Sequence, residues 1–370
     1  MRWRSGKVSN VTLSGLALVA LLCAAGVERC TVEKRARYYD QKMDASRLAL
    51  VAQQAVRDGR LERGLPIDSV NDFNTTGLIG PQYTLITTDR AALRLKLTST
   101  NPNFAAVIVE LLERAKVRRG DTVGVALTGA YPGLNIAVVS ACEALKVEPL
   151  IITSVGSSSW GATDPTYTWL DMESVLYERG VFHHRSVAAS LGGGADLGKG
   201  LSPRGRELIR DAAERNGCEF IEAVSLEESI ARRMDIYDSL SAGQPLKAYI
   251  NVGGGVASMG SSQNARLIPP GVTVDLGLRP FPQKGVTLLM AARGVPIIHL
   301  LEVDRIAERF DLPIAPEPLP EIGEGKIFAT SVYSVPVALG VLLFYSGVMF
   351  CLIRLDVKHY LFRPRHEEMT

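Results

Sequence analysis

The sequence predicts an α/β fold with a mostly parallel sheet flanked by helices, placed between an N-terminal and a C-terminal transmembrane helix. Three observations predict this arrangement. Short apolar runs alternate with helical stretches through the middle of the chain, as in a parallel sheet covered on both faces. Glycine-rich loops follow four of these runs. A long stretch without charged residues lies near each end of the chain.

The first hydrophobic segment covers residues 11–27 and follows a basic N-terminus, residues 1–10, that we expect to be cytoplasmic. At about 1.5 Å per residue, this segment is barely long enough to cross a bilayer core of about 30 Å. We interpret it as a transmembrane helix or an uncleaved signal anchor. A cleaved signal peptide is the alternative, because Ala24, Ala25 and Gly26 resemble a cleavage site.

The second hydrophobic segment, residues 332–353, precedes a basic tail at residues 354–370. Basic residues tend to stay on the cytoplasmic side, so the tail is expected to be cytoplasmic and residues 28–331 to lie across the membrane. We therefore expect a protein of the cell (inner) membrane whose main domain is extracytoplasmic. A pair of buried core helices is the alternative interpretation of the two segments.

Three parts are expected between the membrane segments. Residues 28–77 are predicted to form a stalk helix and a loop, because apolar residues recur at helical intervals from Tyr38 to Ala55. Residues 78–311 are predicted to form the extracytoplasmic α/β domain. Residues 312–331 contain four prolines and are predicted to form a stiff tether.

The α/β domain is expected to contain five core strands and at least four helices. The expected strands are residues 122–127, 149–154, 186–191, 218–223 and 248–252, and the expected helices are residues 104–117, 135–145, 203–216 and 226–240. Two further runs, 272–278 and 286–290, are expected as edge strands, and residues 296–310 as a final helix.

Composition excludes several classes of protein. The chain has 41 Lys and Arg against 39 Asp and Glu, a balance that does not predict binding to nucleic acid. No metal site is expected, because the five cysteines lack metal-ligand spacing; Cys142 and Cys218 are expected as core residues, or as a disulfide. No cofactor is expected, because the loop at residues 193–200 lacks the Ser or Thr that a nucleotide site needs after Lys199.

Four glycine-rich loops form the expected binding site. In an open parallel sheet, loops at the carboxyl ends of strands line one crevice, and glycine lets backbone N–H groups approach an anionic ligand. The alternative is that these glycines only make tight turns. The candidate ligand-binding residues are Thr128, Gly129, Gly133, Ser157, Ser158, Gly193, Gly194, Lys199, Gly253, Gly254 and Gly255.

A serine nucleophile is a second hypothesis for the same region. Ser158 and Ser159 follow a predicted buried strand, and Asp164 and His183 lie downstream in an order that some hydrolases use. The strand-turn motif G-x-S-x-G is absent, so a polar turn and a surface histidine are the alternative. His299, within an apolar run, is expected to be a hydrogen-bonded core residue.

Basic residues are in excess over residues 251–300. Arg266, Arg279, Lys284 and Arg293 stand there against a single acid, Asp275. Such an excess can attract an anionic polymer. A solvated basic face is the alternative interpretation.

Three loop segments resemble those of the poly-gamma-glutamate system protein family: GVALTGAYPGLN at residues 124–135, ITSVGSSSWGA at 152–162 and NVGGG at 251–255. The resemblance covers most of the chain, including both hydrophobic ends. It implies an accessory role in the synthesis, export or retention of a capsule-type polymer, with the membrane subunits of poly-gamma-glutamate synthase as partners. The resemblance assigns no catalytic residues to this sequence. A polymer-cleaving or polymer-transferring hydrolase and a non-catalytic scaffold therefore both remain alternative hypotheses.

Overall fold

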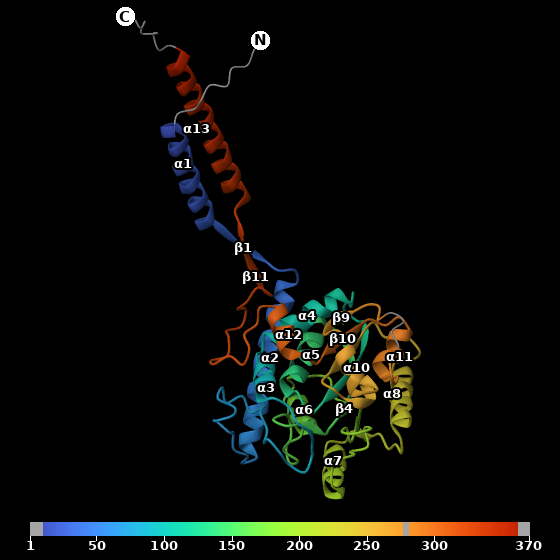
Figure 1. The fold of residues 1–370 in the computed structure, drawn as a ribbon. Helices are drawn as coiled ribbons and strands as arrows, with labels where there is room; N and C mark the ends of the chain where they lie inside the picture. The colour runs from blue at the N-terminus through green and yellow to red at the C-terminus, as the bar shows by residue number, and fades with distance from the viewer. Residues whose placement is uncertain (1–9, 277–280, 362–370) are drawn as a thin grey trace, which may run out of the picture. The chain divides into compact units, whose positions relative to one another are not determined.

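The computed structural model describes residues 10–276 and 281–361. The chain divides into two compact units (Figure 1). The first unit combines the two ends of the chain, up to Arg35 and from Ala329 onward. The second unit is the continuous stretch Ala36–Phe328 and contains the α/β domain.

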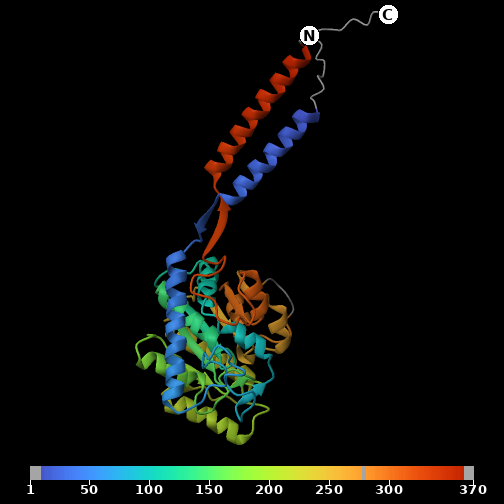
Figure 2. The same ribbon diagram turned by 90° about the vertical axis from the view of Figure 1, so that its left-hand side faces the viewer.

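The first unit consists of two helices and a two-stranded ribbon. Helix α1, Asn10–Arg29, and helix α13, Val335–Leu361, lie side by side (Figure 2), and β1, Thr31–Arg35, pairs antiparallel with β11, Ala329–Tyr333. Among the described residues, one helical stretch is long and apolar enough to cross a membrane: Val335–Leu352, with a mean hydropathy of 2.2 and no residue buried. This stretch falls within the second predicted hydrophobic segment.

The second unit is built around a seven-stranded sheet with the order β7-β6-β4-β3-β8-β10-β9. All neighbours in it pair in parallel except β9, which is an antiparallel edge strand. The strands are β3 Thr122–Thr128, β4 Glu148–Ser154, β6 Ala188–Ser190, β7 Glu219–Phe220, β8 Tyr249–Val252, β9 Gly271–Thr273 and β10 Ile297–Leu300. The predicted α/β fold with a mostly parallel sheet is therefore confirmed.

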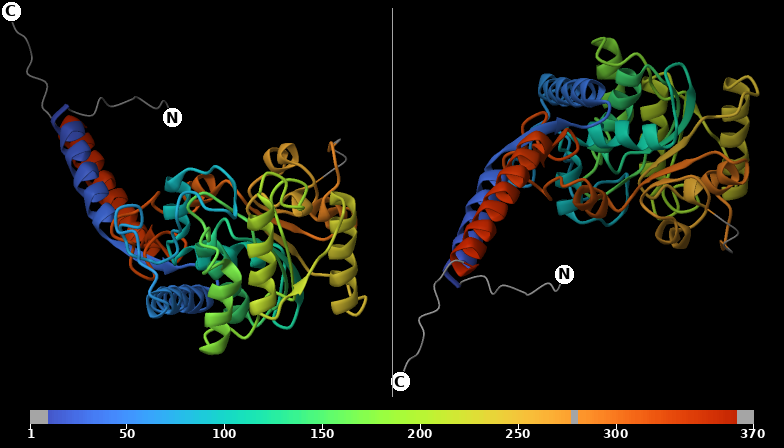
Figure 3. Two further views of the ribbon diagram at one scale, coloured as in Figure 1. Left: turned by 90° about the horizontal axis from the view of Figure 1, so that it is seen from below. Right: turned by 90° about the horizontal axis from the view of Figure 1, so that it is seen from above.

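The helices cover both faces of this sheet. The described helices of the second unit are α2 Tyr39–Glu62, α3 Leu93–Ser99, α4 Phe104–Arg114, α5 Pro132–Leu145, α6 Trp169–Glu178, α7 Pro203–Arg215, α8 Leu226–Leu240, α9 Val256–Met259, α10 Ser262–Leu267, α11 Val286–Ala292 and α12 Val303–Arg309. Successive strand residues point to opposite faces. Ile151 accordingly joins the core around α2, α4 and α5, whereas Ile152 joins the core around α8 and α11. Figure 3 shows helices on both sides of the sheet.

The predicted segments 28–77, 78–311 and 312–331 do not coincide with compact units, because Ala36–Phe328 forms one unit. Helix α2 is not a separate stalk, because Ala45, Ala49, Ala52 and Val56 are buried in the core of the second unit. The proline-rich stretch also packs on this unit and is not a free tether. Asn74 donates a hydrogen bond to the Pro316 carbonyl at 2.8 Å.

Three predicted elements after residue 270 differ from the observed ones. Residues 286–290 belong to helix α11 and not to an edge strand. The start of the predicted final helix forms strand β10, because all four of its residues are buried between β8 and β9; helix α12 follows it. The predicted edge strand 272–278 overlaps β9, and residues 277–278 lie outside the described residues.

The remaining predictions about the core concern cysteines and His299. Cys142 is buried and Cys218 half-buried, and both are free thiols. His299 is fully buried in β10, where Asn251 hydrogen-bonds its Nδ1 at 3.1 Å and its Nε2 lies 3.2 Å from the Ala265 carbonyl oxygen. Burial lowers the pKa of His299, as expected for a neutral core histidine.

Candidate functional site

The order of the strands places a switch point between β3 and β8. From β3 the chain proceeds outward through β4, β6 and β7, then returns to the other side of β3 and continues through β8 and β10. The loops after β3 and β8 therefore leave the sheet in opposite directions. In doubly wound sheets, the crevice at such a point is the usual place for a ligand.

A cavity of about 610 Å³ lies at this position, and we call it the strand-end cleft. The loops that follow β3, β4, β6, β8 and β10 all contribute to it. Its lining residues are Thr88, Asp89, Arg90, Ala91, Ala92, Leu95, Thr128, Ala130, Tyr131, Ser154, Gly156, Ser158, Gly193, Gly194, Lys199, Gly254, Gly255, Val256 and Leu301. The four predicted glycine-rich loops thus come together around one cavity.

Two glycines let the loops after β3 and β4 pack against their neighbours. A Cβ atom at Gly129 would lie 2.4 Å from the Val155 carbonyl oxygen, and one at Gly156 would lie 2.7 Å from the Leu191 carbonyl oxygen. These are backbone atoms that cannot move aside cheaply, so both positions require glycine. Gly129 is a structural residue of the wall and does not itself line the cleft.

Gly133 and Gly253 also serve the wall. A Cβ atom at Gly133 would lie 2.3 Å from the Ser99 carbonyl oxygen, where helix α5 meets α3. Gly253 has a φ of +81°, and its backbone N–H donates to the Leu300 carbonyl at 2.9 Å. Neither residue lines the cleft, whereas Thr128, Gly193, Gly194, Gly254 and Gly255 do.

A buried ion pair lies beneath the cleft. Arg233 Nη2 is 3.1 Å from Asp196 Oδ2, and both side chains are almost completely buried, at 1% and 0% exposure. Arg233 also donates to Ser154 Oγ at 3.0 Å and to Ser190 Oγ at 2.7 Å, and the Ser229 hydroxyl donates to Asp196 at 2.6 Å. This network ties the loop after β6 to helix α8 and to the ends of β4 and β6.

A buried lysine also lies against the cleft. Lys96, on α3, is 1% exposed, and its Nζ is 2.8 Å from Ser158 Oγ. Nζ also donates to the Ala130 carbonyl and lies 3.8 Å from the centre of the Tyr131 ring. Burial lowers the pKa of Lys96 to about 7, although the negative charge of Asp89 opposes the shift.

The mouth of the cleft carries more positive than negative charge. Arg90 and Lys199 are exposed lining residues, and Asp89 is the acidic side chain among the lining residues given above. Two exposed basic side chains therefore stand against one acid. Since charges of one sign around a cavity raise the local concentration of ions of the opposite sign, the cleft is suited to an anionic ligand.

The loop that carries Lys199 does not form a nucleotide-binding cradle. Its two ends pair with each other: the Gly194 N–H donates to the Lys199 carbonyl at 3.3 Å, and the Lys199 N–H donates to the Gly194 carbonyl at 3.2 Å. Ser202 then caps helix α7 through the Gly205 N–H at 3.0 Å. Lys199 projects from this closed loop as an exposed cation.

Three of the predicted serine and aspartate candidates have structural roles. Ser157 is buried and donates to the Gly129 carbonyl at 2.9 Å. Ser159 donates to the Asp89 carbonyl at 3.2 Å and accepts from the Ala91 N–H at 3.1 Å. Asp164 caps the turn at Thr166 and lies 3.7 Å from Arg60, away from the cleft. Ser158 is the member of this group that lines the cleft.

The structure separates His183 from Ser158. His183 is 75% exposed and pairs with Glu143, and its neighbour His184 contacts Glu148, the first residue of β4. Ser158 lies in the short strand β5, Ser157–Ser158, beyond the other end of β4. Because a strand of the length of β4 spans about 20 Å, the structure does not bring Ser158 and His183 together.

Lys96 and the Asp196–Arg233 pair are site residues that the sequence did not reveal. Lys96 occurs in the short run LRLKLTS, where nothing marks one basic residue as buried and the other as exposed. Arg233 stands beside Arg232 in a charged helix, and only the packing of α8 distinguishes them.

The predicted basic excess at residues 251–300 does not form part of the cleft. Arg266 and Lys284 are absent from its lining, and Arg293 pairs with Asp238 at 2.5 Å. Arg279 lies outside the described residues. The positive charge at the strand-end cleft comes from other elements.

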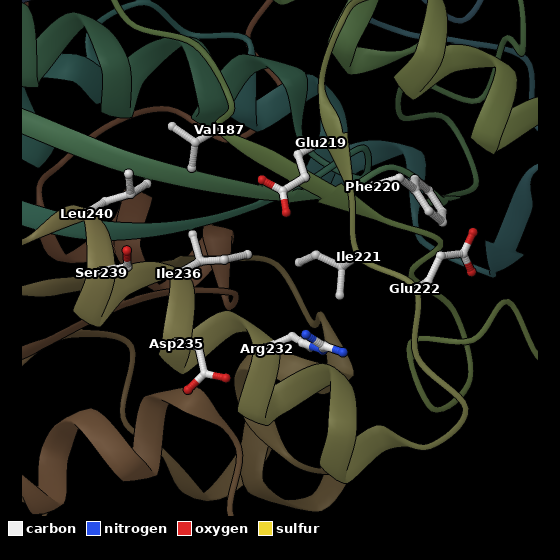
Figure 4. A pocket seen from close by; sticks show the side chains of 10 residues that line it. All are labelled: Val187, Glu219, Phe220, Ile221, Glu222, Arg232, Asp235, Ile236, Ser239 and Leu240. Atoms are coloured by element: carbon white, nitrogen blue, oxygen red, sulfur yellow. The ribbon is translucent and has the colours of Figure 1, made fainter.

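A second cavity of about 610 Å³ lies between β7 and α8, and we call it the edge groove. Figure 4 shows side chains of the two elements facing each other across it. Its charged lining residues are Glu219, Glu222, Asp235 and Arg232, so acids predominate. No group of three His, Cys, Asp or Glu side chains is placed to hold a metal ion in the described part of the chain.

No family model, no curated protein and no solved structure matches the chain. The fold and the cleft nevertheless define a class: a doubly wound α/β domain with a cationic cleft at the carboxyl ends of its strands.

Proposed function

We propose that the protein is a membrane-anchored accessory protein of poly-gamma-glutamate synthesis, export or retention, and that the strand-end cleft binds the anionic polymer. The observation that carries this proposal is the position of Arg90 and Lys199 at the mouth of a cleft formed by glycine-rich loops. Polyglutamate offers a carboxylate on every residue, which basic side chains bind through charge-assisted hydrogen bonds.

The volume of the cleft supports a chain-like ligand held at one point. Its volume of about 610 Å³ accommodates only a short segment of a polymer. The cations at the mouth are exposed, so they can contact carboxylates that lie outside the cavity. We therefore propose that the cleft holds one or a few residues while the remaining chain stays in solvent.

The anchoring part of the proposal rests on the first unit. We propose that α1 and α13 both cross the cell membrane, with both chain ends cytoplasmic and the α/β domain extracytoplasmic. Support comes from the apolar composition of α13 and from the basic residues beyond it. Two helices in the bilayer would also offer a surface to the membrane subunits of the synthase.

Binding is tested with the full chain in detergent micelles and fluorescently labelled poly-gamma-glutamate. The double variant Arg90→Glu, Lys199→Glu should weaken binding roughly tenfold or more, because two attractive contacts become repulsive. The matched control Arg266→Glu, Lys284→Glu makes the same change in net charge outside the cleft lining. Equal losses from both variants would show nonspecific charge attraction and contradict the proposed site.

The membrane orientation is tested with single cysteines and a membrane-impermeant maleimide, in a background in which all five native cysteines are replaced by alanine. Val224 is 88% exposed, so Val224→Cys should react in intact spheroplasts. Thr370→Cys, in the tail, should react only after the membrane is permeabilised. The reverse pattern would place the α/β domain in the cytoplasm and remove the proposed role.

A further inference from the structure

Binding of an anion does not explain the contact between Lys96 and Ser158. A cation that attracts carboxylates works best at the surface, as Arg90 and Lys199 do, whereas the Lys96 amine is buried behind the wall. Its Nζ faces the hydroxyl of Ser158, which is half-buried and lines the cleft. A ligand in the cleft can therefore contact the serine, whereas the amine is buried behind it.

The surroundings of Lys96 also differ from those of a structural lysine. A buried structural lysine is normally paired with a carboxylate, as Lys42 is with Glu110 at 2.8 Å. Lys96 contacts a carbonyl, a hydroxyl and the face of the Tyr131 ring, and within the described residues no salt bridge joins it to a carboxylate. Because no salt bridge in the part of the chain that the structure describes offsets its burial, the pKa of Lys96 is lowered to about 7, which makes the neutral amine accessible near neutral pH.

We infer that Ser158 is a nucleophile and Lys96 its general base, and that together they form an acyl-transfer site for amide or ester bonds in a carboxylate-bearing chain. Lys96 Nζ donates to Ser158 Oγ at 2.8 Å and to the Ala130 carbonyl. Once the amine has lost its proton, its lone pair is within reach of the Ser158 hydroxyl and can accept that proton. A serine activated by an adjacent base is the usual requirement for such a nucleophile.

The proposed reaction balances with water as the second reactant. Ser158 Oγ forms a bond to the substrate carbonyl carbon while its proton moves to Lys96 Nζ. The bond from that carbon to the amine or alcohol then breaks, and the leaving group takes the proton from Lys96. Water next gives a proton to Lys96 and its hydroxide adds to the acyl carbon, after which Ser158 leaves and recovers the proton.

The neighbouring serines make the assignment to Ser158 specific. The hydroxyls of Ser157 and Ser159 donate to the backbone carbonyls of Gly129 and Asp89. Neither serine has a recorded hydrogen bond to a titratable side chain in the described structure. Ser158 alone of the three combines a lining position with a basic partner.

The choice of substrate rests on the proposed function, whereas the serine–lysine pair does not. Arg90 and Lys199 at the mouth would hold carboxylates of the chain whose bond Ser158 attacks. An amide-linked chain of glutamates offers such carboxylates. The mechanism is therefore tested first with a reagent that needs no carboxylate.

The full chain in detergent micelles is treated with a fluorophosphonate, which reacts with activated serines, and the modified residue is located by mass spectrometry. We expect the adduct on Ser158, with a rate that rises with pH and reaches half its maximum near pH 7, because Lys96 must be neutral to accept the proton. This test needs only the wild-type protein. An adduct on another serine, or no adduct between pH 6 and 9, would overturn the inference.

Variants separate a chemical role for Lys96 from a structural one. Lys96→Met should lower the labelling rate about 100-fold, because it removes the base while keeping an unbranched side chain. Lys96→Arg keeps a cation and hydrogen-bond donors but cannot accept the proton, so it should lose a similar factor. The exposed Lys247→Met is the control and should label like the wild type. Labelling that survives in both Lys96 variants would contradict the role of Lys96 as the base.

Poly-gamma-glutamate distinguishes failure of the inference from failure of the proposed function. Shortened chains with wild type and intact chains with Ser158→Ala support both. If the polymer binds but is not shortened and Ser158 is not labelled, the proposed reaction is wrong and the proposed binding function stands. If Ser158 is labelled but the polymer does not bind, the proposed reaction stands and the polymer is not the ligand.

Discussion

The strand-end cleft and the edge groove have the same volume, about 610 Å³, but opposite chemical characters. The cleft has basic side chains at its mouth, a buried lysine in contact with a lining serine, and a buried ion pair beneath it. The groove has three acids and one arginine on its walls. Cavity size therefore does not identify the site, whereas position on the sheet and the polar groups behind the wall do.

The same helix, α8, contributes to both cavities. Arg232 points to the edge groove, and Arg233, the next residue, lies beneath the cleft. Successive helical residues are rotated by about 100° from each other, so one arginine stays in solvent while its neighbour is buried. The difference shows where the fold has buried charge, and therefore where substitutions should matter most.

The largest expected effect comes from Arg233→Met. The substitution leaves the Asp196 carboxylate buried without its cation, so the free energy of unfolding should fall by about 3–5 kcal/mol. Arg232→Met, one residue away, removes a 3.9 Å surface contact with Glu228 and should cost less than about 1 kcal/mol. Denaturant unfolding of the two variants measures the difference. Equal losses would mean that the network under the cleft is not a special feature of the fold.

Much of the sheet was predictable because its strands are buried on both faces. The run Thr122–Thr128 and the helix Leu226–Leu240 were located within one residue, since their composition and the residues around them agree with their structure. Residues 286–290, and residues 297–300 at the start of the predicted helix 296–310, were predicted with the wrong type of element. Both are short apolar runs, for which periodicity does not distinguish a strand from a buried helix.

The cleft was predictable in position but not in chemistry. Glycine-rich loops after successive strands mark the carboxyl edge of a parallel sheet, so the approximate location follows from Gly129, Gly193 and Gly254 in the sequence. The partner of Ser158 did not follow, because Lys96 comes from a helix 62 residues earlier in the chain. A contact of that kind depends on tertiary packing and leaves no local pattern.

A smaller effect is expected in the pH dependence of the free energy of unfolding. It tests whether the lysine buried at the cleft is neutral, in contrast to the charged arginine at the groove. The folded protein holds the pKa of Lys96 at about 7, against about 10.4 for an unfolded chain. Between these values the unfolded state binds one more proton than the folded state, so Lys96 makes the free energy of unfolding rise with pH, by about 1.4 kcal/mol per unit. Below pH 7 both states are protonated and this contribution stops changing.

Thermal unfolding of the full chain at pH 7, 8 and 9 measures this slope as the difference between wild type and Lys96→Met, which cancels the other titrating groups. The free energy of unfolding of wild type should increase relative to that of Lys96→Met as the pH rises. The difference between wild type and Arg232→Met should stay constant, because a guanidinium remains charged over the whole range. A flat difference for Lys96→Met would mean that the amine stays charged in the folded protein. Lys96 would then stabilise the wall as a cation, and it could not take a proton from Ser158.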